Sequence, residues 1–266
     1  MSGEQRLPSG ARLHVETHGD ARGPGLLCIH GLGGGAYFFA ALGDALKSNT
    51  HTVAFDLPGH GLSPRDPQGF CFDRTADHVV ELARLHSARP MWLLGHSLGV
   101  IVALKAYARA PDLFSGMIFV GGLPEATLES KARLLERAAF IRTRGTMAGL
   151  GAAIVPYLLA PEALQAMPGI LGPMQRLVEI NDAANYAETC ESLAHASASD
   201  AVANVRVPCR LIVGSADRYA SPAAVRAFAE KLPGHPSVIE FPACGHFPFF
   251  EKAVEFNQAV ADALKS

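Results

Sequence analysis

Short apolar runs alternate with longer segments of helical spacing along most of the chain. The short runs are rich in Val, Ile, Leu and Phe, as is typical of strands that are buried on both faces of a sheet. They occupy residues 26–29, 53–57, 91–94, 117–120, 211–213 and 238–241. The longer segments occupy residues 36–46, 74–86, 98–109, 222–231 and 253–264. This alternation predicts an α/β fold with a mostly parallel central sheet and helices on both of its faces.

The alternation stops between residues 123 and 204. This segment is rich in Ala, Leu and Met, contains scattered Gly and Pro, and has its apolar residues at helical rather than strand spacing. We therefore expect a helical cap at residues 123–204, inserted over the carboxyl edge of the sheet. The core would then consist of two parts, residues 1–122 and residues 205–266.

Composition and charge exclude several kinds of partner. The chain has 266 residues, 49% of them hydrophobic, which suits one large domain or a domain with an insertion. The formal net charge is -2 and Lys and Arg form no dense run, so neither nucleic acid nor an anionic membrane surface is expected as a partner. The start of the chain is polar and no later apolar run is long enough to cross a bilayer, which favours a cytoplasmic protein without membrane insertion. The sequence leaves the oligomeric state open.

Neither a metal ion nor an organic cofactor is expected. The five cysteines are scattered and form no CxxC pair, so we expect buried structural thiols rather than disulfides or metal ligands. The glycine-rich run at residues 31–35 lacks both the GxGxxG order and the GK[ST] ending of nucleotide-binding loops.

The stretch GHSLG, residues 95–99, contains a candidate nucleophile. Ser97 lies between an apolar run and an Ala-rich helical segment, with Gly95 and Gly99 two positions away on either side. A side chain can stand at the tip of a sharp strand-to-helix turn only where the residues at these two positions are small. The backbone N–H of Leu98 would then lie at a helix N-terminus, where it can stabilise an oxyanion. An ordinary helix N-cap is the alternative role of Ser97, but the flanking glycines favour the nucleophile.

Five motifs, in this order along almost the whole chain, resemble those of the α/β-hydrolase family. They are HGLGG (30–34), DLPGHGLS (56–63), GHSLG (95–99), GSADRYASP (214–222) and GHFPFFE (245–251). The resemblance implies the α/β-hydrolase fold and similarity to serine esterases and enol-lactonases, and the chain order Ser, Asp, His is also that of the family. One departure is Val100, where many relatives have a second glycine. It implies either a slightly wider packing distance between helix and sheet or a compensating small neighbour such as Ala103.

Carried over position by position, the resemblance implies a catalytic triad and an oxyanion hole. Ser97 would be the nucleophile, His246 the general base and later the general acid, and Asp217 the carboxylate that orients the imidazole. The backbone N–H groups of Leu32 and Leu98 would bind the oxyanion.

Other residues compete for two of these roles. Glu125, which follows the fourth predicted strand, and Asp200 are alternatives for the acid, although the match of the GSADRYASP motif favours the aspartate within it. Three further histidines fall inside motifs in which the family uses histidine to shape loops, so a structural role is expected for His30, His60 and His96.

The substrate pocket is expected beside these motifs. Tyr37 and Phe38 follow the oxyanion loop, Leu123 leaves the sheet beside the expected nucleophile, and Phe247 follows the expected base. We expect these residues to form a mainly apolar pocket with Met and Leu side chains of the cap, although each of them alone also suits the core. A polar cluster in the predicted cap either binds a polar substrate group or faces solvent: Asn181, Asp182, Asn185 and Tyr186.

A serine nucleophile narrows the reaction. It excludes the activities of relatives with Asp at this position, such as haloalkane dehalogenases and epoxide hydrolases, and of relatives with Cys, such as dienelactone hydrolases. We expect cleavage of a small, largely apolar carboxylic ester or lactone through an acyl-serine intermediate. One alternative is a carbon–carbon bond hydrolase with the same triad, whose acidic substrate would require a pocket cation such as Arg142 or Arg144. The other is a non-catalytic ligand-binding protein on a hydrolase scaffold.

Overall fold

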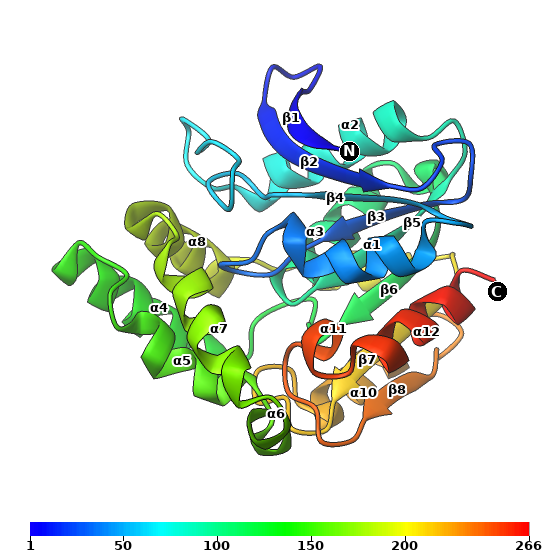
Figure 1. Ribbon diagram of the computed structural model, residues 1–266. Coiled ribbons are helices and arrows are strands. Elements are labelled where there is room, and N and C mark those ends of the chain that lie inside the picture. The colour runs from blue at the N-terminus through cyan, green and yellow to red at the C-terminus, as the bar shows by residue number, and fades with distance from the viewer. Residues whose placement is uncertain (266) are drawn as a thin grey trace.

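The central sheet of the computed structural model has the strand order β1-β2-β4-β3-β5-β6-β7-β8 (Figure 1). The structure describes residues 1–265. The strands are β1 (Ser2–Arg6), β2 (Arg12–His18), β3 (Gly25–Ile29), β4 (His51–Phe55), β5 (Met91–His96), β6 (Phe114–Val120), β7 (Cys209–Gly214) and β8 (Val238–Phe241). Strands β3 to β8 pair in parallel, whereas β1 and β2 form an antiparallel edge on β4. The predicted α/β fold with a mostly parallel sheet is confirmed, and every predicted run is a strand, although β4 begins and ends earlier than expected.

Helices cover both faces of the sheet. One face is covered by α2 (Phe72–His86), α3 (Leu98–Arg109) and α10 (Pro222–Lys231). The other face is covered by α1 (Ala40–Leu46) and α12 (Ala253–Ala263). A 3-10 turn at Ala36–Phe39 precedes α1, and the short helix α11 (Pro248–Glu251) precedes α12.

Strand β5 shows why these strands are apolar throughout. Leu93 belongs to the hydrophobic cluster beneath α2 and α3, while Leu94 belongs to the cluster beneath α1 and α12. Successive side chains of a strand point to opposite faces. A sheet covered on both faces therefore needs an apolar residue at every position, which is the continuous run from which the strand was predicted.

The antiparallel edge is a feature that the hydrophobic pattern does not predict. The side chains of β1 are almost all exposed, so its sequence, SGEQR, carries no apolar signal. In β2, Leu13 and Val15 are buried, but polar residues surround them. Such an edge forms through backbone hydrogen bonds to a neighbouring strand, which local sequence does not encode.

The chain between β6 and β7 forms a run of helices, which we call the helical segment (residues 123–204). They are α4 (Leu128–Arg144), α5 (Leu150–Leu158), α6 (Pro161–Ala166), α7 (Leu171–Glu179), α8 (Ala183–His195) and α9 (Ser199–Val202). Within it α4 packs on α8 and α5 packs on α7, and these four helices lie together to one side of the sheet (Figure 1). Each of the helices α4 and α8 has an N-cap side chain. Thr127 caps α4 by accepting a hydrogen bond from the N–H of Ser130, and Asp182 caps α8 by accepting one from the N–H of Asn185.

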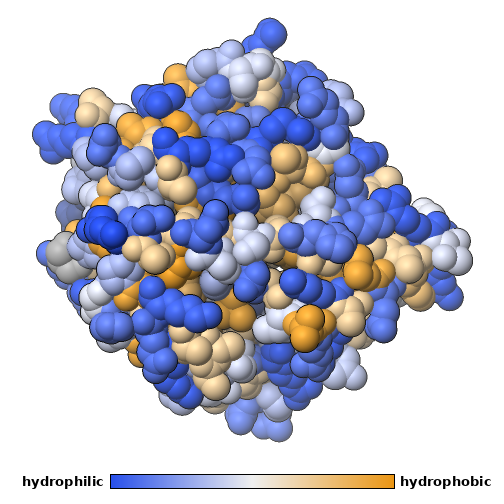
Figure 2. All heavy atoms as spheres, turned by 180° about the vertical axis from the view of Figure 1, so that it is seen from behind, coloured by the Kyte–Doolittle hydropathy of each residue, from blue (hydrophilic) through white to orange (hydrophobic). Residues whose placement is uncertain are grey.

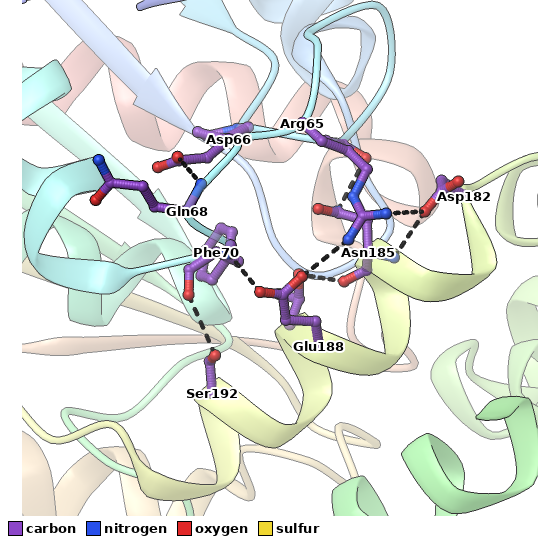
Figure 3. Close-up of polar contacts among 12 residues, drawn as sticks. Arg65, Asp66, Gln68, Phe70, Asp182, Asn185, Glu188 and Ser192 are labelled. Atoms are coloured by element: carbon purple, nitrogen blue, oxygen red, sulfur yellow. Dashed lines mark hydrogen bonds and ion pairs between the residues drawn. The ribbon is translucent and has the colours of Figure 1, made fainter.

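Polar contacts join α8 to the loop that follows β4 (Figure 3). The carboxylate of Glu188 accepts hydrogen bonds from the backbone N–H of Phe70 at 3.0 Å and from Arg65 Nη2 at 3.1 Å. One turn earlier, Asn185 Nδ2 donates to the backbone oxygen of Gly59 at 2.9 Å. These contacts fix one side of the helical segment to the core.

The surface seen in Figure 2 is a mosaic in which hydrophilic residues surround small hydrophobic patches. Such scattered apolar exposure is ordinary for a folded domain. Within residues 1–265, no helix combines the length and the hydrophobicity that crossing a bilayer requires.

We expect Glu188→Ala to lower the free energy of unfolding by about 1–3 kcal/mol, because it leaves the N–H of Phe70 without its charged acceptor. The measurement is thermal and urea unfolding followed by circular dichroism. The control is Glu240→Ala, which removes only the exposed ion pair with Arg226 and is expected to change stability by less than about 0.5 kcal/mol. Equal effects of the two substitutions would contradict the anchoring role of Glu188.

Candidate active site

The turn between β5 and α3 places Ser97 at the carboxyl edge of the sheet. Ser97 has φ 53° and ψ -116°, a backbone conformation that a residue with a side chain rarely adopts. The glycines on either side make the turn possible, because a Cβ at Gly95 would lie 2.5 Å from the oxygen of Gly99. A Cβ at Gly99 would lie 2.3 Å from the oxygen of Ile29 in β3. The predicted strand, turn and helix therefore meet at a very close backbone contact.

Two further glycines, at the end of β6, make room for the site. A Cβ at Gly121 would lie 3.0 Å from Asp217 Oδ2. A Cβ at Gly122 would lie 2.6 Å from both the backbone oxygen of Ser97 and Cγ2 of Val100. Gly122 is thus the small residue opposite Val100, a role that the sequence analysis expected of a neighbour such as Ala103. The pair of glycines directly after an apolar run is the signal that could have identified it.

A buried hydrogen bond joins the loops that follow β7 and β8. His246 Nδ1 donates to Asp217 Oδ2 at 2.8 Å, and both side chains are almost fully buried. The second carboxylate oxygen, Oδ1, accepts from the N–H groups of Tyr219 at 2.8 Å and Ala220 at 3.0 Å. The carboxylate is thereby held on both oxygens, and a ring with its proton on Nδ1 has Nε2 free to accept another.

Buried side chains of His96 and Glu251 help to fix the backbone around His246. His96 Nε2 lies 3.0 Å from the backbone oxygen of His246 and donates to it, and burial lowers the pKa of His96 well below its usual value, which keeps that ring neutral. The buried carboxylate of Glu251 accepts from the N–H of Gly245 at 2.8 Å and of Phe247 at 3.1 Å. It also accepts from the N–H of Ala160 in the helical segment at 2.8 Å. Glu251 ends the GHFPFFE motif, but its role could not be inferred from that position.

Ser97 and His246 line one cavity between the sheet edge and the helical segment. Leu32 and Leu98 also line it, and the backbone N–H of each has no acceptor among the described residues. For Leu98 this follows from its position as the first residue of α3. The remaining wall is mostly apolar and includes Ile101, Leu134, Ile154, Val155, Leu158, Met174, Leu177, Val178 and Leu193.

The structure brings three of the four predicted pocket residues to this cavity. Phe38, Leu123 and Phe247 line it. Tyr37 is not among the described residues that line it, and its ring instead packs edge-on against Phe38 with 5.1 Å between ring centres. Of the polar cluster predicted in the cap, Tyr186 lines the cavity, whereas the others bond to backbone or cap α8.

The competing residues occupy other places. Asp200 is exposed in the first turn of α9, and Glu125 is exposed beside the cavity mouth, where its backbone bridges to Ser197. His30 Nδ1 donates to the oxygen of the next residue and its Nε2 accepts from the N–H of Leu57, while burial lowers its pKa to about 4. These contacts shape the loop after β3.

Arg137 and Tyr219, which the sequence analysis did not single out, also line the cavity. Arg137 of α4 lines the cavity and its Nη2 donates to the hydroxyl of Tyr219 at 3.0 Å. The two arginines considered from the sequence are elsewhere, since Arg142 pairs with Glu191 and Arg144 lies over the ring of Phe140. Helical spacing alone does not distinguish these three arginines. In the part of the chain that the structure describes, no group of three or more His, Cys, Asp or Glu is placed to hold a metal ion.

Comparison with known proteins identifies the family. The model of the alpha/beta hydrolase family matches residues 26–259, so the chain belongs to this family. A pimeloyl-[acyl-carrier protein] methyl ester esterase of Chromobacterium violaceum is 30% identical over 96% of this chain and 98% of its own length. A 2-(acetamidomethylene)succinate hydrolase of Mesorhizobium japonicum is 25% identical over 89% of this chain and 86% of its own length.

Solved structures share the fold. The enol-lactonase of Burkholderia xenovorans has a TM-score of 0.89 and 23% identity, with 99% of this chain and 100% of that chain covered. The predicted α/β-hydrolase fold, the family and the assignment as a hydrolase are therefore confirmed.

We expect Gly99→Ala to destabilise the protein by about 3 kcal/mol or more, because its Cβ meets the rigid backbone oxygen of Ile29. The measurement is the melting temperature, together with the yield of soluble protein. Gly169→Ala is the matched control, since Gly169 lies exposed in the 3-10 turn Pro168–Ile170 with open space around it, and we expect it to change stability by at most about 1 kcal/mol. A Gly99→Ala protein as stable as the control would refute the close contact.

Proposed function

We propose that this protein is a serine hydrolase that cleaves a small, largely apolar carboxylic ester or lactone, with Ser97, His246 and Asp217 as its catalytic triad. The observation that carries the proposal is the shared cavity. It is bordered by a serine at a strained turn and by a histidine whose Nδ1 is held by a buried carboxylate. These are the parts that acyl transfer through a serine requires.

Acylation would begin with proton transfer from Ser97 Oγ to His246 Nε2 while Oγ attacks the carbonyl carbon. The carbonyl oxygen becomes an oxyanion, and the unpaired N–H groups of Leu32 and Leu98 are suited to bind it. The protonated His246 then gives its proton to the leaving alkoxide as the carbon–oxygen bond breaks. Throughout this step Asp217 stabilises the imidazolium.

Deacylation would repeat these steps with water. His246 Nε2 accepts a proton from a water molecule that attacks the acyl-serine, and the oxyanion occupies the same two N–H groups. The bond between the acyl carbon and Ser97 Oγ then breaks, and His246 returns the proton to Oγ. The products are a carboxylic acid and, for an ordinary ester, an alcohol. A lactone instead opens to a single hydroxy acid.

The apolar wall of the cavity supports a substrate with a largely apolar acyl or alcohol part. The names of the relatives agree with carboxyl chemistry, since one is a methyl ester esterase and a protein of the same fold is an enol-lactonase. We further propose that residues 123–204 act as a cap domain, because helices α4, α5, α7 and α8 supply much of that wall.

We expect the protein to release p-nitrophenol from p-nitrophenyl esters, and Ser97→Ala to reduce kcat/KM by about 1,000-fold or more, because the nucleophile is lost. The control is Ser115→Ala, an exposed serine of β6 outside the cavity, which should retain native turnover. A folded native protein that cleaves neither esters nor lactones and fails to react with a fluorophosphonate would refute the serine hydrolase and favour a ligand-binding role. Cleavage of a vinylogous diketone instead of esters would favour the carbon–carbon hydrolase.

We expect Asp217→Asn to reduce kcat by about 1,000- to 10,000-fold with little change in KM. The neutral amide no longer stabilises the imidazolium, and it no longer holds the neutral imidazole in the tautomer with its proton on Nδ1. The matched control is Asp200→Asn, at the competing aspartate, which should leave kcat unchanged. A large loss in the control and none in Asp217→Asn would transfer the acid role to Asp200. Both variants are first compared with the native protein by circular dichroism.

A further inference from the structure

Arg137 is a partly buried cation in the wall of the cavity. Its Nη2 donates to the hydroxyl of Tyr219 at 3.0 Å, and Tyr186, whose pKa Arg137 acts to lower, lines the same cavity. Among the residues that the structure describes, no Asp or Glu forms an ion pair with Arg137. The partner of its hydrogen bond is thus a neutral hydroxyl, which does not balance its charge.

The other arginines of α4 that form ion pairs differ from Arg137 in this respect. Arg133 also borders the cavity, but it pairs with Glu129 one turn earlier, and both side chains are well exposed. Arg142 pairs with Glu191 of α8 at the surface. The charges of these two arginines are balanced within the protein, whereas Arg137 lines the cavity without a carboxylate partner among the described residues.

An arginine in this position remains charged. Burial acts to lower the pKa of Arg137, but electrostatic interactions with Tyr186, Tyr219 and Cys190 and the hydrogen bond to Tyr219 raise the pKa above its ordinary value. A charge withdrawn from water without a counterion is unfavourable, and an anion entering the cavity would remove that cost. The planar guanidinium has five N–H donors, and Tyr219 accepts from Nη2 alone. Donors on the other nitrogens can therefore bind both oxygens of such an anion.

Arg137 is separated from the proposed catalytic residues by one tyrosine. The ring of Tyr219 lies 5.4 Å from the ring of His246, and its backbone N–H donates to Asp217. Arg137 Cζ lies 6.0 Å from the centre of the same tyrosine ring. A molecule whose carbonyl group lies at Ser97 can therefore extend along this wall and reach the guanidinium with its other end.

We propose that Arg137, with the hydroxyls of Tyr186 and Tyr219, binds a carboxylate that the substrate carries at a distance from the bond that is cleaved. The inference rests on the proposed function and narrows its substrate class to half-esters of dicarboxylic acids, or to lactones that carry a carboxylate. A carboxylate fits better than a phosphate, because one uncompensated cation matches one negative charge. Glu125, which also borders the cavity, would oppose a second negative charge.

The test compares two series of p-nitrophenyl esters. One series contains the half-esters of succinic, glutaric and adipic acid, and the other contains the same compounds with the free carboxylate capped as a methyl ester. We expect the native protein to prefer the best half-ester over its capped form by about tenfold to a hundredfold in kcat/KM, the usual value of a charged hydrogen bond. Arg137→Gln should abolish this preference, because it lowers kcat/KM for the half-esters far more than for the capped esters, and Arg137→Lys should retain part of the preference.

The ratio of kcat/KM for the half-esters to kcat/KM for the capped esters distinguishes a role of Arg137 in substrate binding from a purely structural role. A purely structural arginine would lower turnover of both series together, because its loss would disturb α4 and Tyr219 alike, and this outcome would overturn the inference. Arg142→Gln is the matched control, since Arg142 lies on the same helix in an exposed ion pair, and it should keep the native ratio. Melting temperatures of all variants show whether each one is folded.

A binding experiment distinguishes failure of this inference from failure of the proposed function. Glutarate and inorganic phosphate are titrated calorimetrically into the native protein, Ser97→Ala and Arg137→Gln. Glutarate binding that persists in Ser97→Ala and is lost in Arg137→Gln would support the carboxylate site even if no ester were cleaved. Cleavage of capped esters without glutarate binding or half-ester preference would overturn this inference alone, and tighter binding of phosphate than of glutarate would overturn the choice of a carboxylate.

Discussion

The close backbone contact between the turn after β5 and the end of β3 is the constraint on which the site depends. At Gly99 the first turn of α3 approaches the oxygen of Ile29 so closely that a side chain has no space. This approach holds α3 against the sheet and keeps Ser97 in its unusual backbone conformation. It also leaves the N–H of Leu98 unpaired at the start of the helix, beside the serine. The proposed nucleophile and one proposed oxyanion donor are therefore products of a single packing contact.

The parallel sheet brings the partners of this turn to the same place. Loops that leave the carboxyl ends of parallel strands meet at one edge, so residues distant in sequence become neighbours there. The loop after β7 carries Asp217 and the loop after β8 carries His246, and their hydrogen bond joins the two loops. Glu251 then ties the second loop to Ala160 in the helical segment, so the position of the histidine also depends on that segment.

Buried polar groups in the site differ in how well they are satisfied. The carboxylate of Asp217 accepts hydrogen bonds on both oxygens, which suits a group that has a fixed position in every step of the proposed reaction. Arg137 has the hydroxyl of Tyr219 as a partner but no carboxylate among the described residues. A protein fold can tolerate such an imbalance where a ligand supplies the missing charge, as the proposed substrate carboxylate would do at Arg137.

The amino-acid sequence alone determined the strands β3 to β8, the family and the three residues proposed as a triad. Strands buried on both faces need continuous apolar runs, and the sharp turn at Ser97 needs glycines at set positions around it. Both features can therefore be predicted from short stretches of sequence. Only the tertiary structure decided the antiparallel edge, the packing of Tyr37 outside the cavity, and Gly122 as the residue opposite Val100. It alone also distinguished Arg137 from its neighbours on α4. These features depend on contacts between segments far apart in sequence, and helical spacing or residue type does not specify which side chain meets which.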